Sequence, residues 1–456
     1  MDQTYMKEKP VVPLLLSMGI PVIISMIAGA LYNIVDSIFV AMISEDAMTA
    51  VSLVYPIQNL AHAAGVGFGV GINAMVARRL GEGKTRMANQ TASQGVFLSA
   101  LHGMILTILG MAVIPYFLRM FTSDEVTISY GLTYFCNVFL FSTIDTMGMA
   151  YEKVYQSVGK MKISMAAVLI GCGVNIVLDP IFIFGLGPMP ELGICGAAWA
   201  TGIGQTASLL FYLILNHVKP LNVEISLREM RPSKEICGGM YSVGIAATLN
   251  MALTSLLLTA LNAILAPFSQ VYILVLGVYY KLQALLYQGA SGVVQGMRPL
   301  IGYNYGAGEQ ERVKKIFRAA LMIVGIIMTA GTLLGELVPD FLMGLFTQTP
   351  STVEIGRTAL RIISPGFVMS TVSVIASGAF EGLALCRDYH SDRICAQPDH
   401  RSYRCMARVL AGRAYYGSVC WGELEADDYC VFIGRFWSQK GCIYVRLKTL
   451  LFTRAQ

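Results

Sequence analysis

Apolar runs long enough to cross a lipid bilayer recur along most of this chain. A run of about 20 apolar residues matches the thickness of the hydrocarbon core. Backbone groups inside lipid have to bond within their own segment, so each run is predicted to be a helix. Ten runs meet this description, at residues 13–43, 52–77, 90–117, 130–151, 163–186, 193–216, 238–266, 271–297, 316–338 and 356–383. The chain is therefore predicted to be an all-α polytopic membrane protein.

Composition agrees with this prediction and excludes other classes. The 456 residues are 55% apolar and only 13% charged, whereas a soluble domain carries about 25% charged residues. The net charge of +5 is attributed to basic connecting loops, so no nucleic-acid partner is expected. The first apolar run is too long for a cleaved signal peptide. The lipid bilayer is the expected surrounding.

The chain also repeats itself at an offset of 225 residues. Residues 65–83 resemble residues 290–308, and four glycines align, with Gly67, Gly71, Gly81 and Gly83 falling on Gly292, Gly296, Gly306 and Gly308. Two similar halves are expected, with the functional site between them. The polar connection 217–236 follows six spans, so it is predicted to link the halves. Because six is even, both halves enter the membrane in the same direction.

Two glycine-rich turns end the repeated segments. Gly81-Glu-Gly83 and Gly306-Ala-Gly308 lack the Gly-Lys-Ser/Thr ending of a phosphate-binding loop, so a nucleotide site is not expected. Each is predicted to end a span and turn the chain. No nucleophile–base pair or metal cluster lies near a membrane face, so the chain is not expected to be an enzyme.

Positive charges predict the orientation. Of the 22 Lys and Arg residues up to residue 383, 18 lie at the N-terminus or in alternate loops, and Lys153 is counted among the loop residues. Basic loops stay on the cytoplasmic side, so the N-terminus is predicted to be cytoplasmic and the protein to lie in the cell membrane. Glu152 and Glu381 are expected near cytoplasmic ends of spans, in contact with solvent. Lys281 is the one cation left inside a span.

The pattern of the second half stops after Leu383. Residues 384–456 hold six of the ten cysteines and 18 of the 61 charged residues, with no apolar run long enough to span. The repeat predicts two more spans there. A cysteine-rich domain, a natural cytoplasmic extension and a reading-frame change near residue 384 are the three interpretations. The cysteine gaps are poor zinc spacing, and a reading-frame change is favoured because helical periodicity and membrane patterning end together.

The predicted organisation follows from these boundaries. Residues 1–216 form a first lobe of six spans, and 217–236 form a cytoplasmic linker. Residues 237–383 form an incomplete second lobe of four spans. Residues 384–456 form an atypical tail rich in Cys and Arg.

Carboxylates inside spans are the strongest functional candidates, because an Asp at mid-membrane depth costs about 2.5–3.5 kcal/mol. Asp36 lies in the first span and Asp179 in the fifth. Asn175 precedes Asp179 by four residues and shares its helix face, and Pro180 leaves the carbonyl of Ile176 without its helical partner. These oxygens suit Na⁺, and desolvated carboxylates could carry H⁺ instead. The alternative is a pair of buried Asp residues that bond to neighbouring helices.

Other polar residues are weaker candidates, for a substrate cavity. Asp145 lies alone in the fourth span, and Tyr32 and Asn33 precede Asp36 in the first. Lys281 and Gln283 lie in the eighth span. Lys281 either faces a cavity or extends toward the membrane surface.

Four segments, in the right order and at the right spans, resemble the multidrug and toxic compound extrusion (MATE) family. They are Tyr32-Asn-Ile-Val-Asp36, Tyr151-Glu-Lys-Val-Tyr-Gln-Ser-Val-Gly159, Asn175-Ile-Val-Leu-Asp179 and Gly302-Tyr-Asn-Tyr-Gly-Ala-Gly308. The resemblance covers about residues 10–383. It implies two lobes of six helices about a central cavity. It also implies a cation site at Asp36, Asn175, Asp179 and Thr201, and a bend of the first helix at Pro21.

The function that the resemblance implies is antiport. Small organic cations and amphipathic drugs would leave in exchange for Na⁺ or H⁺, with no bound cofactor, and a monomer is expected. Two alternatives remain open. A flippase for lipid-linked precursors or polysaccharides would be favoured by a cavity rich in Arg. A non-functional remnant would be favoured by the incomplete second lobe.

Overall fold

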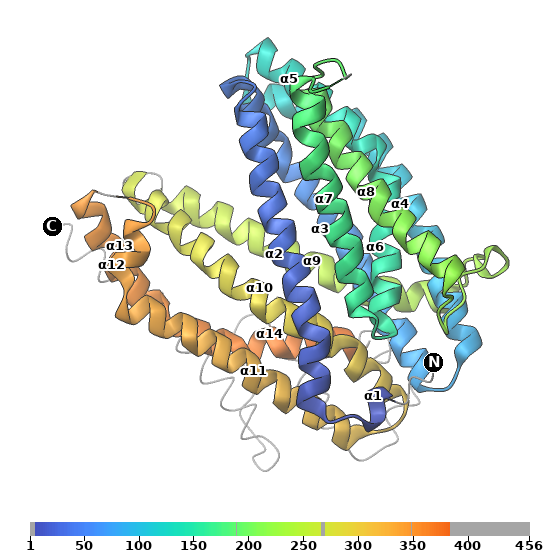
Figure 1. Ribbon diagram of the computed structural model, residues 1–456. Helices are drawn as coiled ribbons and strands as arrows, with labels where there is room; N and C mark the ends of the chain where they lie inside the picture. The colour runs from blue at the N-terminus through green and yellow to red at the C-terminus, as the bar shows by residue number, and fades with distance from the viewer. Residues whose placement is uncertain (1–4, 188, 266–269, 348, 384–456) are drawn as a thin grey trace. The chain divides into compact units, whose positions relative to one another are not determined.

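The computed structural model describes residues 5–187, 189–265, 270–347 and 349–383, all of which belong to one compact unit, Met1–Cys386 (Figure 1). Every element in these ranges is helical. Seven helices in the described part of the chain are long and apolar enough to cross a membrane, and the predicted all-α polytopic fold is confirmed. The tail 384–456, and with it the predicted reading-frame change, lies outside the described residues.

The first half contains eight helices. In chain order they are α1 (Tyr5–Glu8), α2 (Val11–Ala41), α3 (Glu45–Gly81), α4 (Thr85–Phe121), α5 (Glu125–Leu140), α6 (Ser142–Ser157), α7 (Met161–Phe184) and α8 (Ile194–Val218). Polar side chains begin two of them. The Ser44 side chain accepts a hydrogen bond from the Ala47 N–H, and Asp124 accepts one from Thr127, so backbone donors at both helix starts are satisfied.

The second half follows a short 3-10 turn, η1 (Leu227–Glu229). Its helices are α9 (Lys234–Leu265), α10 (Gln270–Gly306), α11 (Gln310–Leu337), α12 (Pro339–Gly344), α13 (Pro350–Ile363) and α14 (Pro365–Leu383). The predicted turns at the repeated glycines are present. After α3 and α10 end, Gly83 has φ 71° and Gly308 has φ 76°, a conformation that only glycine adopts without strain.

The fourth span of each half is broken, where the sequence predicts one helix. Between α5 and α6, the Thr107 hydroxyl of α4 donates to the carbonyl of Phe139 at 2.7 Å. Between α13 and α14, the Thr332 hydroxyl of α11 donates to the carbonyl of Ser364 at 2.9 Å. Both pairs are 225 residues apart, so the two halves satisfy the freed carbonyl in the same way. In the second half Pro365, which has no N–H, follows directly and helps to break the helix.

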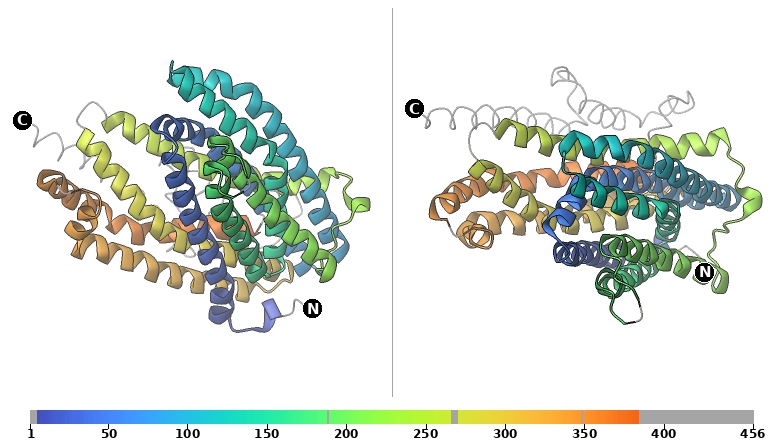
Figure 2. Two further views of the ribbon diagram at one scale, coloured as in Figure 1. Left: turned by 45° about the horizontal axis from the view of Figure 1, so that its top comes forward. Right: turned by 90° about the horizontal axis from the view of Figure 1, so that it is seen from above.

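The two halves interlock through their first two long helices. α3 packs against α9, and α10 packs against α2 (Figures 1 and 2). The repeated glycines allow the close approach. A Cβ on Gly71 would lie 2.2 Å from the Met240 carbonyl oxygen of α9, and a Cβ on Gly292 would lie 2.3 Å from Ile23 of α2. The second long helix of each half therefore rests on the first long helix of the other.

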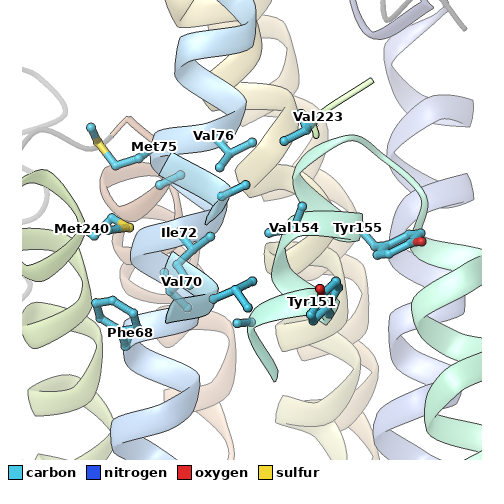
Figure 3. Close-up of a cluster of buried hydrophobic side chains, with 14 of the residues drawn as sticks. Phe68, Val70, Ile72, Met75, Val76, Tyr151, Val154, Tyr155, Val223 and Met240 are labelled. Atoms are coloured by element: carbon cyan, nitrogen blue, oxygen red, sulfur yellow. The ribbon is translucent and has the colours of Figure 1, made fainter. Parts of the chain in front are cut away.

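The core of the first half lies between α3 and α6. Figure 3 shows Ile72 and Val76 of α3 and Val154 of α6 among its buried side chains, with Met240 of α9 beside α3. Val223, from the connection between the halves, is 1% exposed in the same core. The predicted linker is thus packed onto the first half by an apolar side chain.

The linker is also held to α4 by polar bonds. The N–H of Ser226 donates to Ser93 Oγ, and the N–H of Ser233 donates to Gln94 Oε1, each at 3.0 Å. Since Ser93 and Gln94 face the linker, the polar start of α4 serves as its docking surface.

Candidate functional site

Three helices of the first half bring the predicted ion-site residues together. Asp36 of α2 is 7% exposed, and Asn175 and Asp179 of α7 are 2% and 0% exposed. The Asn175 amide nitrogen lies 3.3 Å from Asp179 Oδ1 and 3.4 Å from Thr201 Oγ1 of α8. The four residues therefore form one buried polar cluster.

The amide of Asn175 is best satisfied in its other orientation. Its nitrogen then donates to Asp179 Oδ2 at 3.2 Å, and its oxygen accepts from the Thr201 N–H, also at 3.2 Å. Either orientation links α7 to α8. Asn175 therefore fixes the position of the Asp179 carboxyl group.

The carboxyl groups of Asp36 and Asp179 are hydrogen-bonded to one another. Two carboxyl groups can form such a bond only when one of them carries a proton, because an ionised carboxylate is an acceptor alone. Asp36 Oδ1 is buried and has no hydrogen-bond partner among the described residues. An unpartnered buried oxygen is costly, and here it leaves a free acceptor beside the pair.

The donor set fits a hard cation as well as a proton. Two carboxyl groups, an amide and a hydroxyl are the oxygen ligands that such cations prefer. The cluster could thus bind Na⁺ between Asp36 and Asp179 or hold one proton between them.

Two residues near this cluster were not predicted. Tyr134 of α5 is 5% exposed, bonds to Gln58 of α3 and interacts electrostatically with Asp36 and Asp179. A tyrosine and a glutamine on apolar spans carry no sequence signal that separates them from core residues. Only the packing of α3 and α5 against α2 shows that they belong to the site.

Of the predicted cavity residues, Tyr32 and Asp145 lie near the ion cluster. The Tyr32 phenol interacts electrostatically with Asp36, Asp145 and Asp179. Asp145 of α6 also interacts with His62 of α3. The isolated carboxylate of the fourth span therefore shares the environment of the other two.

The remaining cavity candidates lie elsewhere. Asn33 is exposed, and its amide donates to the Gly29 carbonyl of its own helix at 2.8 Å. It follows Tyr32 by one residue, which turns it about 100° around the helix. Lys281 of α10 is exposed, with its ammonium 5.6 Å from the centre of the Phe346 ring. Gln283 is half-buried on α10, and no contact among the described residues joins it to Asp36.

Pro21 is buried within α2, which continues through it without a break. The Ser25 hydroxyl donates to the Pro21 carbonyl at 2.9 Å. A Cβ on Gly296 of α10 would lie 2.9 Å from the Gly19 backbone, so α10 crosses α2 beside the proline. That α2 bends at Pro21 stays a prediction.

The charged residues near the end of α6 do not lie in solvent as expected. Lys153, counted with the loops, is 5% exposed, and its ammonium lies 2.9 Å from Glu152 Oε1. Glu381 of α14 forms a buried ion pair with Arg298 of α10. The prediction is wrong because α6 continues to Ser157, beyond the expected end at residue 151, and packs against other helices.

Two interlocked helical halves, with a buried carboxyl pair inside one of them, define a polytopic membrane transporter. The MatE family model matches residues 21–181 and 246–387, and the chain belongs to this family, as its four motifs indicate. The family consists of transporters, not enzymes.

The curated relatives of the chain include multidrug export proteins. The multidrug export protein MepA of Staphylococcus aureus (strain MRSA252) is 24% identical over 378 residues, which are 83% of each chain. MepA of Staphylococcus haemolyticus (strain JCSC1435) is 23% identical over 433 residues, or 95% of this chain and 94% of the relative. The longer alignment includes residues beyond Leu383, and the reading-frame change stays a prediction.

Solved structures show the same architecture. A MOP superfamily transporter from Pyrococcus furiosus is 25% identical and has a TM-score of 0.77, with 85% of this chain and 86% of that chain covered. A MATE transporter in complex with MaL6 gives the same identity and coverage and a TM-score of 0.78.

Proposed function

We propose that this protein is an antiporter that exports small organic cations and other amphipathic drugs in exchange for H⁺ or Na⁺. The multidrug export relatives support the class of substrate. The observation that supports coupling to an ion is the hydrogen-bonded pair of Asp36 and Asp179, buried in a span. Carboxyl groups at such depth are costly to keep without a function.

The ion would act by changing the balance between two arrangements of the halves. Such an effect requires that the ion bind the two arrangements with different affinity. Asp36 lies on α2 and Asp179 on α7, and α2 also contacts α10 of the second half. Binding of an ion between the two carboxyl groups would therefore reposition the helix that joins the halves.

Of the two ions, H⁺ is favoured by the carboxyl pair. The bond between Asp36 and Asp179 needs one shared proton. Na⁺ would have to replace that proton and bind both carboxylates in their ionised form, with Asn175 and Thr201 as neutral ligands. A proton gradient is therefore expected to drive export more effectively than a Na⁺ gradient.

The placement in the membrane follows from the charges. The end that carries α1 would face the cytoplasm, since basic residues of the loops gather there. The protein would be a multi-pass protein of the cell membrane and would work as a monomer, with each half supplying one side of the substrate path.

The test is transport of a fluorescent organic cation in proteoliposomes under a pH gradient or a Na⁺ gradient. Asp36→Asn and Asp179→Asn are each expected to abolish exchange without loss of expression. The matched control is Asp46→Asn, since Asp46 is exposed at the start of α3 and should leave exchange unchanged. Full exchange in both core variants would contradict the proposal.

A further inference from the structure

The contacts between the halves lie toward the end of the molecule that carries α1. There, Lys7 forms an ion pair with Glu309 at 2.7 Å. Toward the other end of α10, the described side chains pair within their own half, as when the Tyr287 hydroxyl donates to Ser370 Oγ at 2.7 Å. The structure is thus one arrangement, in which the halves are joined at the α1 end.

A buried lysine crosses between the halves on this side. The ammonium of Lys153 on α6 donates to Gln295 Oε1 on α10 at 2.9 Å. It also donates to Glu152 Oε1 at 2.9 Å and to Gln156 Oε1 at 3.1 Å. Three side-chain oxygens therefore surround one ammonium group that is almost fully buried.

The three acceptors differ in the half to which they belong. Glu152 and Gln156 lie on the same helix as Lys153, and Gln156 also donates to Glu152 at 2.6 Å. Gln295 alone belongs to the second half. If the halves separate at this end, Lys153 loses one bond and keeps its counter-charge, so no unpaired buried charge is produced. The contact across the halves can therefore open and close again.

The second half shows that the fold itself does not need this lysine. The residue 225 positions after Lys153 is Gly378, and Gly69 corresponds in the same way to Val294. A Cβ on Gly69 would lie 2.8 Å from Lys153 Cγ, whereas a Cβ on Gly378 would lie 2.3 Å from Val294 Cγ1. The same helix contact is filled by an apolar side chain in one half and by a charged one in the other.

Gln295 is held in place from the first half as well. Its amide nitrogen lies 3.4 Å from Met26 Sδ on α2, so the side chain sits between α6 and α2. A glutamine in this place offers Lys153 a neutral acceptor, which binds the ammonium less strongly than a carboxylate would.

We propose that Lys153 and Gln295 form a latch that holds the two halves closed at the α1 end and has to release before that end opens. Both are positioning residues, since they act on the arrangement of the helices and touch neither ion nor substrate. The proposal rests on the proposed transport only in requiring a second arrangement, with the α1 end open.

The test measures the distance between the halves at the α1 end. Spin labels at Arg86→Cys, at the start of α4, and Lys315→Cys, at the start of α11, both exposed, report it by pulsed electron resonance in a cysteine-free background. Gln295→Leu is expected to raise the ratio of long to short distances about tenfold, the effect of one lost bond to a charged donor. Lys153→Met gives the same direction if it folds.

A variant of opposite sign keeps the test independent of folding defects. Gln295→Glu replaces a neutral acceptor by a carboxylate, which should bind Lys153 more strongly and lower the long-distance population. The matched control is Glu381→Gln, because its partner Arg298 lies in the same half. It should change thermal stability without changing the distance distribution.

The outcomes separate the latch from the proposed transport. Unchanged distances in both Gln295 variants, or equal shifts in the Glu381→Gln control, would overturn the latch. Distances that shift as expected while no variant exchanges the fluorescent cation would leave the latch standing and refute the transport. Where exchange is measurable, Gln295→Glu should lower the maximal rate with little change in the half-saturating concentration.

Discussion

Gly81 and Gly306 occupy equivalent positions in the two halves, and each packs against the helix that carries the other. A Cβ on Gly81 would lie 1.9 Å from the Tyr303 carbonyl oxygen of α10, and a Cβ on Gly306 would lie 2.2 Å from the Arg78 carbonyl oxygen of α3. Arg78 and Tyr303 are themselves 225 residues apart. The sequence repeat is thus also a structural contact between the halves.

This contact predicts a cost for any side chain at these two positions. Gly81→Ala and Gly306→Ala place a methyl group against backbone that cannot move away, so each should lower the free energy of unfolding by about 1–3 kcal/mol. Gly29→Ala is the control, because nothing lies within 4 Å of its Cβ position and alanine favours the interior of a helix. Thermal unfolding in detergent measures all three. An equal Tm for Gly306→Ala and Gly29→Ala would contradict the prediction.

The threonines at the helix breaks predict equal effects in the two halves. Thr107→Val and Thr332→Val each remove a hydroxyl that bonds to a carbonyl of a neighbouring helix, so each should cost about 0.5–1.5 kcal/mol of unfolding free energy. Thr206→Val should cost less, since its hydroxyl bonds at 2.7 Å to the Gly202 carbonyl of its own helix. The Tm values of the three variants decide the matter, and an equal loss in Thr206→Val would refute it.

The role of Asn175 predicts a loss of transport. Asn175→Leu removes the amide that fixes Asp179 and leaves one buried carboxyl group without its second partner. Exchange of the fluorescent cation is expected to fall at least about tenfold, the effect of one lost bond of ~1.4 kcal/mol. Thr201→Val keeps the shape and removes one weak contact, so it should have a smaller effect. A larger loss in Thr201→Val than in Asn175→Leu would refute this ranking.

The ion pairs of Glu82 predict a dependence of stability on pH. Burial alone would raise the pKa of Glu82, but the hydrogen bond from Lys84 and the charges of Arg79 and Arg78 outweigh it and hold the pKa below its ordinary value of 4.5. Because the folded value is the lower one, the stabilisation is complete above the unfolded value and is lost as the pH falls through the folded value.

The variant Glu82→Gln tests this dependence. It should lower Tm at pH 7, where Glu82 is ionised, and the difference from the unmodified protein should shrink at about pH 3. The same difference at both pH values would show that the ion pairs do not carry the stabilisation.

The nucleotide sequence tests the interpretation of the tail. If the reading frame changes near codon 383, another frame downstream should encode two apolar spans that complete the second half. The gene sequence decides directly, and the absence of such spans from both other frames would refute the interpretation.

The sequence by itself determined the number and placement of the long helices, the twofold repeat and the identity of the buried carboxyl groups. Apolar length dictates spans, because lipid leaves the backbone no other partner. Asp36 and Asp179 stand out for the same reason, since a carboxyl group inside a span is costly. The glycine pattern also predicted the turns at Gly83 and Gly308.

Only the tertiary structure decided which helices meet. Tyr134 and Gln58 joined the site, and Asn33 left it, because helix rotation and packing depend on neighbours far along the chain. Lys153, which the sequence placed in a loop, became a buried contact between the halves for the same reason. Burial of a charge is decided by the helices that cover it, and no local pattern records which helices those are.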